Sequence, residues 1–177
     1  MMTLDGYFEG ASPWTLEFHT LVWGEELEAF SLKQLNEVGT LLFGRRTFDG
    51  MAGYWSNETG AIADRMNAVE KIVATRIGKT VKWSNARVLQ GDISDHIEAL
   101  KAEDDKKDIY VFGSADLTAT LLAKDAVDEI QICLVPTVLG RGNPLFKDDG
   151  IRRDFKLIES RAFKSGGVLL RYVRTKN

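Results

Sequence analysis

The feature that most constrains this chain is a strand-to-helix step that occurs twice. In each step an apolar run ends at a glycine and a helical pattern follows at once. The first step joins a strand predicted over 41–43, through Gly44, to a helix predicted over 46–51. The second joins a strand predicted over 109–112, through Gly113, to a helix that ends near 122. Strands that alternate with helices predict a mostly parallel sheet with helices on both faces.

Hydrophobic periodicity extends this pattern to the rest of the chain. Asp92 or Ser94 is the expected N-cap of one helix and Ser114 of another. After residue 126 the alternation stops and strands follow one another, which predicts antiparallel strands added at one edge. The further predicted elements are helices over 25–38, 62–67 and 93–100, and strands over 72–74, 87–89, 129–135, 155–163 and 167–174. We therefore expect one α/β domain over residues 1–177.

Composition narrows the classes of function. A chain of 177 residues with 44% hydrophobic and 28% charged residues can bury a core and is not disordered. The net charge of -3, without any long Lys/Arg block, argues against nucleic-acid and membrane partners. No apolar stretch approaches about 20 residues and no signal pattern opens the chain, so the expected compartment is the cytoplasm. Cys133 reads as a small buried hydrophobe, and the two histidines lack the spacing of metal ligands.

Ligands of open α/β sheets bind at the carboxyl ends of the strands, where both turns are expected to lie. Gly44 allows close backbone approach, and the helix start after it offers unpaired N–H groups and a partial positive charge. Arg45 and Arg46 add guanidinium groups suited to phosphate, and Thr47 adds a hydroxyl. The alternative is a solvated basic helix start.

The second turn, Gly113-Ser114-Ala115, repeats this design without arginines and by itself is explained equally well as a capped helix. Thr75 and Arg76, after the strand over 72–74, form a third candidate. If Arg45 and Arg76 converge, the pair suits the 2′-phosphate of NADPH and would favour it over NADH. The G-x-G-x-x-G and G-x-x-x-x-G-K-[ST] signatures are absent in the required context, and Gly140 to Pro144 reads as a turn.

Six segments together resemble the dihydrofolate-reductase-like family, in the branch related to the reductase domain of bacterial riboflavin biosynthesis. They are 3–8, 42–48, 71–75, 111–117, 127–130 and 136–146. The resemblance implies a dihydrofolate-reductase-like fold, NADPH as cofactor and a homodimer. It places Asp5 near the nicotinamide. It places Gly44, Arg45, Arg46, Thr47, Thr75 and Arg76 at the 2′-phosphate and pyrophosphate, with Gly113, Ser114 and Ala115 on the other side of the pyrophosphate.

The chain departs from this family in two places that bear on function. Only two residues precede Thr3, where the family usually has an apolar first strand, which is consistent with a truncated or misassigned start. Folate reductases carry an acidic residue five positions after a Pro-Trp pair, whereas His19 follows Trp14 at that spacing. His19 is a candidate proton donor, with a structural histidine as the alternative. Folate reduction is therefore disfavoured.

All four tryptophans, Trp14, Trp23, Trp55 and Trp83, are candidate pocket walls, although core packing explains such residues more often. Trp14 and Trp55 are the two assigned to the substrate. The acceptor is expected in a cleft formed by the first strand, the loop over 13–19 and Trp55. The leading hypothesis is an NADPH-dependent reductase of a small heterocyclic or carbonyl compound, such as a 5-amino-6-(5-phosphoribosylamino)uracil-like pyrimidine. The alternatives are a nucleotide-binding domain without activity and a true dihydrofolate reductase.

Overall fold

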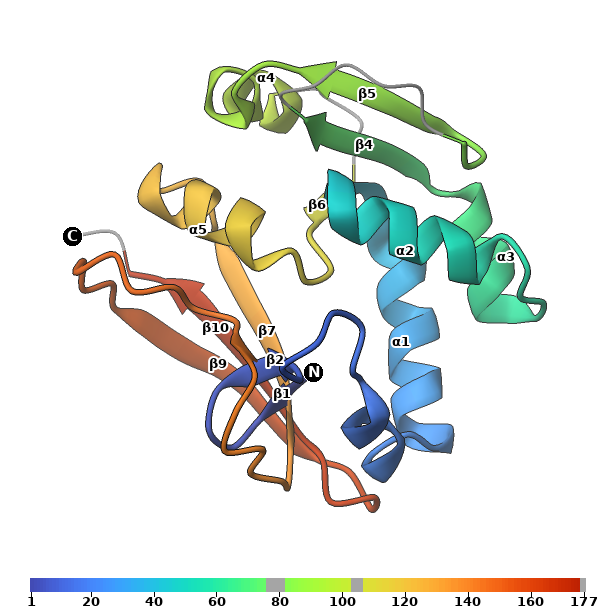
Figure 1. Ribbon diagram of the computed structural model, residues 1–177, viewed down its shortest axis with the longest axis vertical. Coiled ribbons are helices and arrows are strands. Elements are labelled where there is room, and N and C mark those ends of the chain that lie inside the picture. Colours follow the sequence, from blue (N-terminus) through green and yellow to red (C-terminus); the bar gives the residue numbers. More distant parts are fainter. Residues whose placement is uncertain (76–81, 103–106, 176–177) are drawn as a thin grey trace. The chain divides into compact units, whose positions relative to one another are not determined.

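The computed structural model describes residues 1–75, 82–102 and 107–175. The chain divides into two compact units, which are described separately (Figure 1). The inner unit is Ala29–Ala126, and the terminal unit combines Met1–Glu28 with Val127–Asn177. Arg76 lies outside the described residues. The single domain expected over 1–177 stays a prediction.

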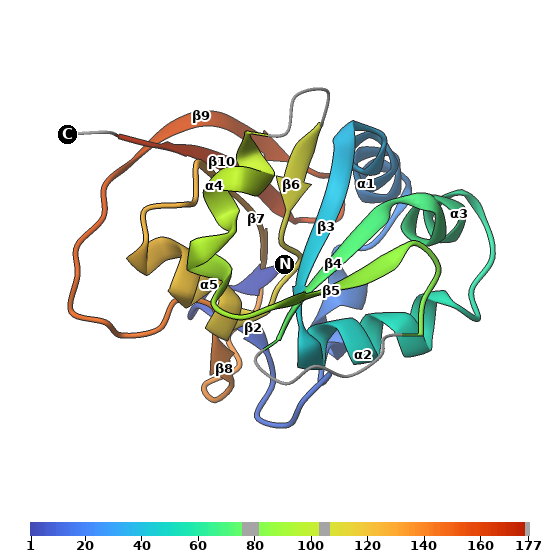
Figure 2. The ribbon, with the colours of Figure 1, turned by 90° about the horizontal axis from the view of Figure 1, so that it is seen from above.

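The inner unit is built on a four-stranded parallel sheet. The strand order is β5 (Ala86–Gln90), β4 (Glu70–Thr75), β3 (Val38–Gly44) and β6 (Asp108–Tyr110). One side of the sheet carries α1 (Glu25–Glu37), α2 (Arg45–Trp55) and α3 (Ala61–Ala68). The other carries α4 (Ile97–Lys101) and α5 (Ala115–Ala123) (Figure 2). The α/β prediction with helices on both faces is confirmed.

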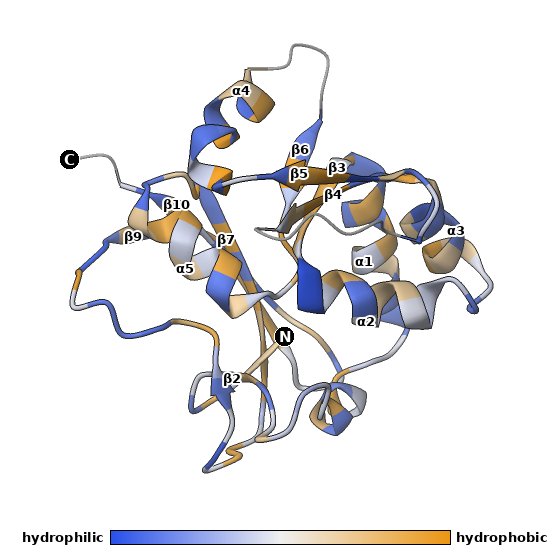
Figure 3. Cartoon of the chain, turned by 45° about the horizontal axis from the view of Figure 1, so that its top comes forward, coloured by the Kyte–Doolittle hydropathy of each residue, from blue (hydrophilic) through white to orange (hydrophobic). Residues whose placement is uncertain are grey.

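The register of β3 and β4 explains why both strands read as continuous apolar runs. Paired residues share a face, so Phe43 and Val73 point to one side of the sheet, and Leu42 and Ile72 point to the other. All four are wholly buried. A strand covered on both faces loses the polar-apolar alternation of a half-exposed strand. Figure 3 shows this as hydrophobic colour along β3 and β4, with hydrophilic colour where α2 begins.

The core beneath α2 draws on every element of that face. Phe43 and Phe48 pack edge-to-face with ring centroids 6.2 Å apart, and both rings approach Trp83. Burial of an aromatic side chain of this size stabilises the fold by about 1.5–3 kcal/mol. The other members of this cluster are Leu35, Val38, Leu41, Ala52, Met66 and Val73.

The terminal unit contains a mixed sheet in the order β1 (Met2–Thr3), β7 (Glu129–Val135), β10 (Val168–Arg174) and β9 (Phe155–Ala162). β1 is parallel to β7, and the remaining pairs are antiparallel. A ribbon of β2 (Tyr7–Glu9) and β8 (Asn143–Pro144) and the short helix η1 (Glu17–Leu21) complete the described elements. The antiparallel C-terminal strands are therefore confirmed. The turn before β10 has Gly166 at a φ of 91°.

Three local expectations need correction. The strand predicted over 109–112 ends at Tyr110, because the backbone leaves the ladder to reach a left-handed turn at Gly113. The helix predicted over 93–100 is broken at His96 into η2 (Ile93–Asp95) and α4, although Asp92 caps η2 as expected by accepting the Ser94 N–H at 3.0 Å. Gly140 to Pro144 is not only a turn, since its last two residues pair with β2.

Candidate cofactor and substrate sites

Apart from Arg76, which lies outside the described residues, the predicted cofactor residues gather at the carboxyl edge of the parallel sheet in the inner unit. Gly44 ends β3 and pairs with Ala74, so that Thr75 ends β4 one residue further along. Tyr110 ends β6 opposite Leu41, and the chain then runs on to Gly113. The edge that general α/β topology assigns to ligands thus carries both turns predicted from the sequence, together with Thr75 of the third candidate pair.

Gly44 and Ser114 are in contact. A Cβ added at Gly44 would lie 2.5 Å from the Ser114 Oγ and 3.9 Å from the Leu117 Cβ. This close approach, and not the backbone conformation, favours glycine at residue 44, because a φ of -73° is open to any residue. The turn at Gly44 and the turn at Gly113 therefore lie next to each other and form one surface.

The backbone of the second turn is left-handed at two successive residues. Gly113 has a φ of 70° and Ser114 a φ of 68°. Ser114 occupies the N-cap of α5 as predicted, yet its side chain accepts no capping hydrogen bond, which corrects the expected cap. The left-handed backbone instead directs the hydroxyl toward Gly44. The unpaired N–H groups and the partial positive charge of a helix N-terminus favour anions, so the start of α5 is a candidate anion site.

The basic residues of the first turn open α2, whose N-terminus also lacks a side-chain cap. Arg45 Nε lies 2.8 Å from Asp49 Oδ2, with both side chains partly exposed. Such an i,i+4 pair is worth only about 0.3–0.5 kcal/mol, so a phosphate can compete for the guanidinium. Arg46 is exposed and Thr47 half-buried. The convergence of Arg45 and Arg76 stays a prediction, because Arg76 is outside the described residues.

Lys71, in the middle of the inner unit, was missed by the sequence reasoning. Its side chain is wholly buried, and its Nζ donates to the carbonyl oxygens of Asn67 (2.8 Å), Val69 (2.7 Å) and Ser84 (3.0 Å). The ammonium also lies 4.6 Å from the centroid of the Trp83 ring. Burial lowers the pKa of Lys71 to about 8. The sequence signal that could have revealed this residue is its charge, because Lys71 directly precedes Ile72 and Val73 in an apolar strand.

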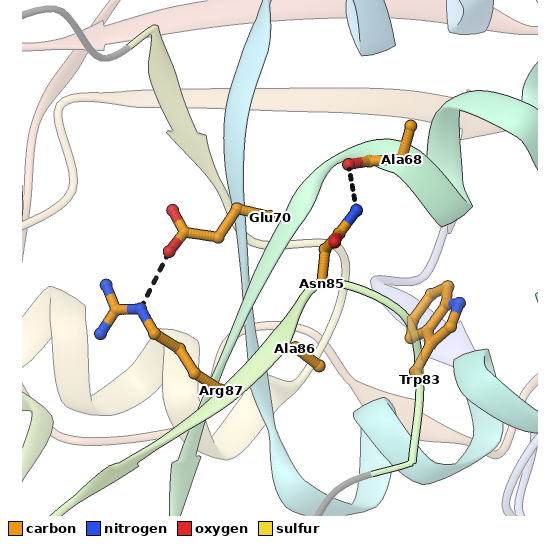
Figure 4. Close-up of a pocket in the computed structure, with 6 residues that line it drawn as sticks. All are labelled: Ala68, Glu70, Trp83, Asn85, Ala86 and Arg87. Atoms are coloured by element: carbon orange, nitrogen blue, oxygen red, sulfur yellow. Dashed lines mark hydrogen bonds and ion pairs between the residues drawn. The ribbon is translucent and has the colours of Figure 1, made fainter.

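A pocket of about 480 Å³ lies at the opposite, amino-terminal edge of β4 and β5 (Figure 4). There Arg87 Nε lies 2.9 Å from Glu70 Oε1, and Asn85 Nδ2 donates to the Ala68 carbonyl at 2.8 Å. Glu70 and Thr75 are the two ends of one strand and stand roughly 16 Å apart at the usual rise. This pocket is therefore not part of the cofactor edge.

In the terminal unit, the Asp5 carboxylate holds two segments together. It accepts hydrogen bonds from the Thr3 hydroxyl (2.7 Å) and from the N–H groups of Leu139 (3.2 Å) and Gly140 (2.7 Å). These hydrogen bonds hold the pKa of Asp5 below its usual value, and the bond from the Thr3 hydroxyl has the largest effect. Its carboxylate anchors the loop that follows β7, and a contact with substrate stays a prediction.

The two candidate tryptophans have different surroundings. Trp14, in the terminal unit, is 41% exposed and has a φ of 65°. Trp55 is the last residue of α2, about 16 Å from Gly44 by the rise of the helix. It packs against the inner core and edge-to-face on Tyr54, with ring centroids 4.9 Å apart. Packing accounts for Trp55, so its predicted contact with substrate has no support from its position.

His19 lies in η1 with its ring edge-to-face against Phe18, at a centroid distance of 4.7 Å. Its Nε2 is buried and has no hydrogen-bond partner in the described part of the chain. Burial lowers the pKa of His19 to about 4. The imidazole is therefore neutral near pH 7, which disfavours the protonated ring as a ready proton donor.

The described part of the chain contains neither a cluster of metal ligands nor a membrane-spanning helix. Within 1–75, 82–102 and 107–175, no three His, Cys, Asp or Glu side chains are grouped as metal ligands. No helix in the same ranges has the length and apolar character needed to cross a bilayer.

Comparison with known proteins identifies the family of this chain. The sequence profile of the RibD C-terminal domain matches residues 1–169. The chain belongs to the RibD C-terminal domain family. The protein YyaP of Bacillus subtilis is 28% identical over 97% of this chain and 90% of its own length.

Solved structures show the same fold at low identity. A putative riboflavin biosynthesis protein from Shewanella sp. PV-4 is 21% identical, with a TM-score of 0.81 over 99% of this chain and 96% of that one. The diaminohydroxyphosphoribosylaminopyrimidine deaminase/5-amino-6-(5-phosphoribosylamino)uracil reductase of Thermotoga maritima gives 17% and 0.67 over 98% and 54%. Dihydrofolate reductase from Enterococcus faecalis, complexed with NADP(H), gives 15% and 0.62 over 99% and 93%. The dihydrofolate-reductase-like fold is therefore confirmed.

Proposed function

We propose that this chain is an NADPH-dependent reductase of a small heterocyclic compound. The contact between Gly44 and Ser114 carries the proposal, because it brings two candidate anion sites side by side at one edge of the sheet. The relationship to the RibD C-terminal domain and the fold shared with an NADP(H)-bound reductase support the same cofactor.

The residues of this edge fit the phosphate groups of that cofactor. Arg45, Arg46 and Thr47 would contact the 2′-phosphate and the pyrophosphate, and Thr75 and Arg76 would add to them. The backbone N–H groups of Gly113, Ser114 and Ala115 would approach the pyrophosphate where no side chain intervenes. Bound NADPH would supply the hydride, and the protein would orient the acceptor and exclude water.

The acceptor we propose is a pyrimidine of the uracil class, which is the type of compound in the name of the Thermotoga reductase. Asp5 would fix the loop beside it, and Trp14 would line its binding site. Since burial keeps His19 neutral, water is the favoured source of the proton. Homodimer formation, expected by resemblance, belongs to the same proposal.

A second candidate, a nucleotide-binding domain without reductase activity, is favoured by the low pKa of His19. Dihydrofolate reduction is the third, and the histidine at the position of the pterin-binding acid argues against it.

The test is titration with NADPH and NADH, followed by tryptophan quenching, and then NADPH oxidation with uracil-type acceptors. We expect NADPH to bind at least tenfold more tightly than NADH, and Arg45→Ala to reduce this preference with little effect on NADH. Lys101→Ala, also in the inner unit but on α4, is the matched control for loss of one positive charge. Equal and millimolar affinities for both nucleotides would refute the cofactor assignment. Tight NADPH binding without turnover would favour the second candidate.

A further inference from the structure

Trp14 has a backbone conformation that is unfavourable for a residue with a large side chain. Its φ of 65° lies in the left-handed region, where a bulky residue is strained. The indole is 41% exposed, so burial in a core does not compensate for the strain. Strained residues of this kind persist where the surroundings impose them, and they concentrate at ligand clamps.

The group that imposes this conformation is the carboxylate of Glu9. Its Oε2 accepts the backbone N–H of Trp14 at 3.0 Å, and its Oε1 accepts Nδ2 of Asn143 at 2.8 Å. Glu9 is 7% exposed. A buried carboxylate that joins two chain segments by hydrogen bonds is costly to disturb, because either loss leaves a desolvated charge with fewer donors.

Short-range contacts close the rest of the loop around this carboxylate. The Gly10 N–H donates to the Thr15 carbonyl at 2.9 Å, which makes 10–15 a small closed loop. Across the β2–β8 ribbon, a Cβ at Gly142 would lie 2.6 Å from the Glu9 carbonyl oxygen. These contacts hold the loop in one conformation, and a loop that is already ordered loses less entropy when a ligand binds.

From these contacts we infer that Glu9 is a positioning residue that presents the indole of Trp14 to a planar, heteroaromatic acceptor ring. This inference rests on the proposed reductase function and adds a specificity determinant to it. Stacking of two aromatic rings accounts for roughly 3- to 10-fold in affinity. A saturated ring, which lacks the flat face, gains none of this.

The first experiment uses binding and does not depend on turnover. The full chain, saturated with NADPH, is titrated with 5,6-diaminouracil as the planar probe and 5,6-dihydrouracil as the saturated one. We expect Trp14→Ala and Glu9→Ala each to weaken the planar probe by about 3- to 10-fold, leaving the saturated probe and NADPH unchanged. Trp23→Ala removes another exposed tryptophan of the same unit and serves as the control.

The second experiment separates positioning from general stability. Glu9→Gln keeps an acceptor for the Trp14 N–H, so it should restore most of the affinity that Glu9→Ala loses. Hydrogen exchange at the Trp14 amide should be fast in Glu9→Ala and slow in the wild type. In the double variant that combines Glu9→Ala with Trp14→Ala, the two losses of affinity for the planar probe should not add, because both substitutions remove the same stacking interaction.

The outcomes are distinct. If Glu9→Ala frees the Trp14 amide but binds the planar probe normally, or if Trp14→Ala has no effect, the inference is wrong. Failure of the wild type to bind 5,6-diaminouracil while it binds NADPH also overturns the inference and leaves the cofactor site standing. Failure to bind NADPH instead refutes the proposed function.

Discussion

The backbone of Gly44 lies against the hydroxyl of Ser114, so that a methyl group at residue 44 would come within 2.5 Å of that oxygen. Residues 70 apart in sequence are joined in this way because β3 and β6 are neighbouring parallel strands that end at the same edge. The contact makes Gly44 and Ser114 a coupled pair, and their coupling is measurable.

Gly44→Ala should destabilise the chain by about 1–3 kcal/mol and weaken NADPH binding, because the new methyl group overlaps the Ser114 hydroxyl. Ser114→Ala removes that oxygen, and the Ser114 Cβ is a tolerable 3.9 Å from the added atom. The double variant should therefore recover most of the stability lost in Gly44→Ala. Urea unfolding measures the free energies, and purely additive losses would contradict the contact.

Asp49→Asn should tighten NADPH binding by a few-fold at low salt. Asp49 holds Arg45 at 2.8 Å and adds a negative charge near the proposed phosphate site. The gain should disappear at high ionic strength, because both side chains are partly exposed and their interaction is screened. Asp116→Asn, in the first turn of α5, removes a different negative charge at the same edge and serves as a second test. Tighter NADH binding of equal size would show that the effect does not involve the 2′-phosphate.

Lys71→Met should cost about 1–3 kcal/mol of stability, because buried carbonyl oxygens lose their charged donor. The pKa of Lys71 is lowered to about 8 in the folded chain, against 10.5 as its ordinary value. Between these values the unfolded chain holds a proton that the folded chain has released, so folding becomes more favourable as pH rises. The difference in unfolding free energy between wild type and Lys71→Met should therefore grow from pH 8 to about 10. A difference independent of pH would contradict the low pKa.

His19 should make the chain sensitive to mild acid. Burial lowers its pKa to about 4 from an ordinary value of 6.5, so in this window the unfolded chain binds a proton that the folded chain does not. The contribution of the neutral His19 imidazole to the free energy of unfolding is complete above pH 6.5 and is lost as the pH falls toward 4. His19→Gln should remove this part of the acid dependence. NMR titration of the imidazole gives the pKa directly, and a value near 6.5 would restore His19 as a candidate proton donor.

Much of the fold could be predicted because its signals are local. The apolar runs at Leu42 and Ile72 marked strands, since strands covered on both faces are continuously apolar. Gly44 marked the end of one of these strands, and Asp92, one of two predicted N-caps, marked a helix start. The same local reasoning failed at Ser114, where it predicted a side-chain cap, because the left-handed backbone that turns the hydroxyl away depends on the neighbouring strand.

The sequence by itself determined the order of the elements, the turns that could bind phosphate and the family, because periodicity, glycine and short motifs act over a few residues. Only the tertiary structure decided which residues meet across the chain: Gly44 with Ser114, the Lys71 ammonium with three carbonyl oxygens, and Glu9 with Trp14 and Asn143. Such contacts follow from strand register and from the desolvation of buried charges. Both are set when distant segments pack, and neither leaves a periodic trace in the sequence.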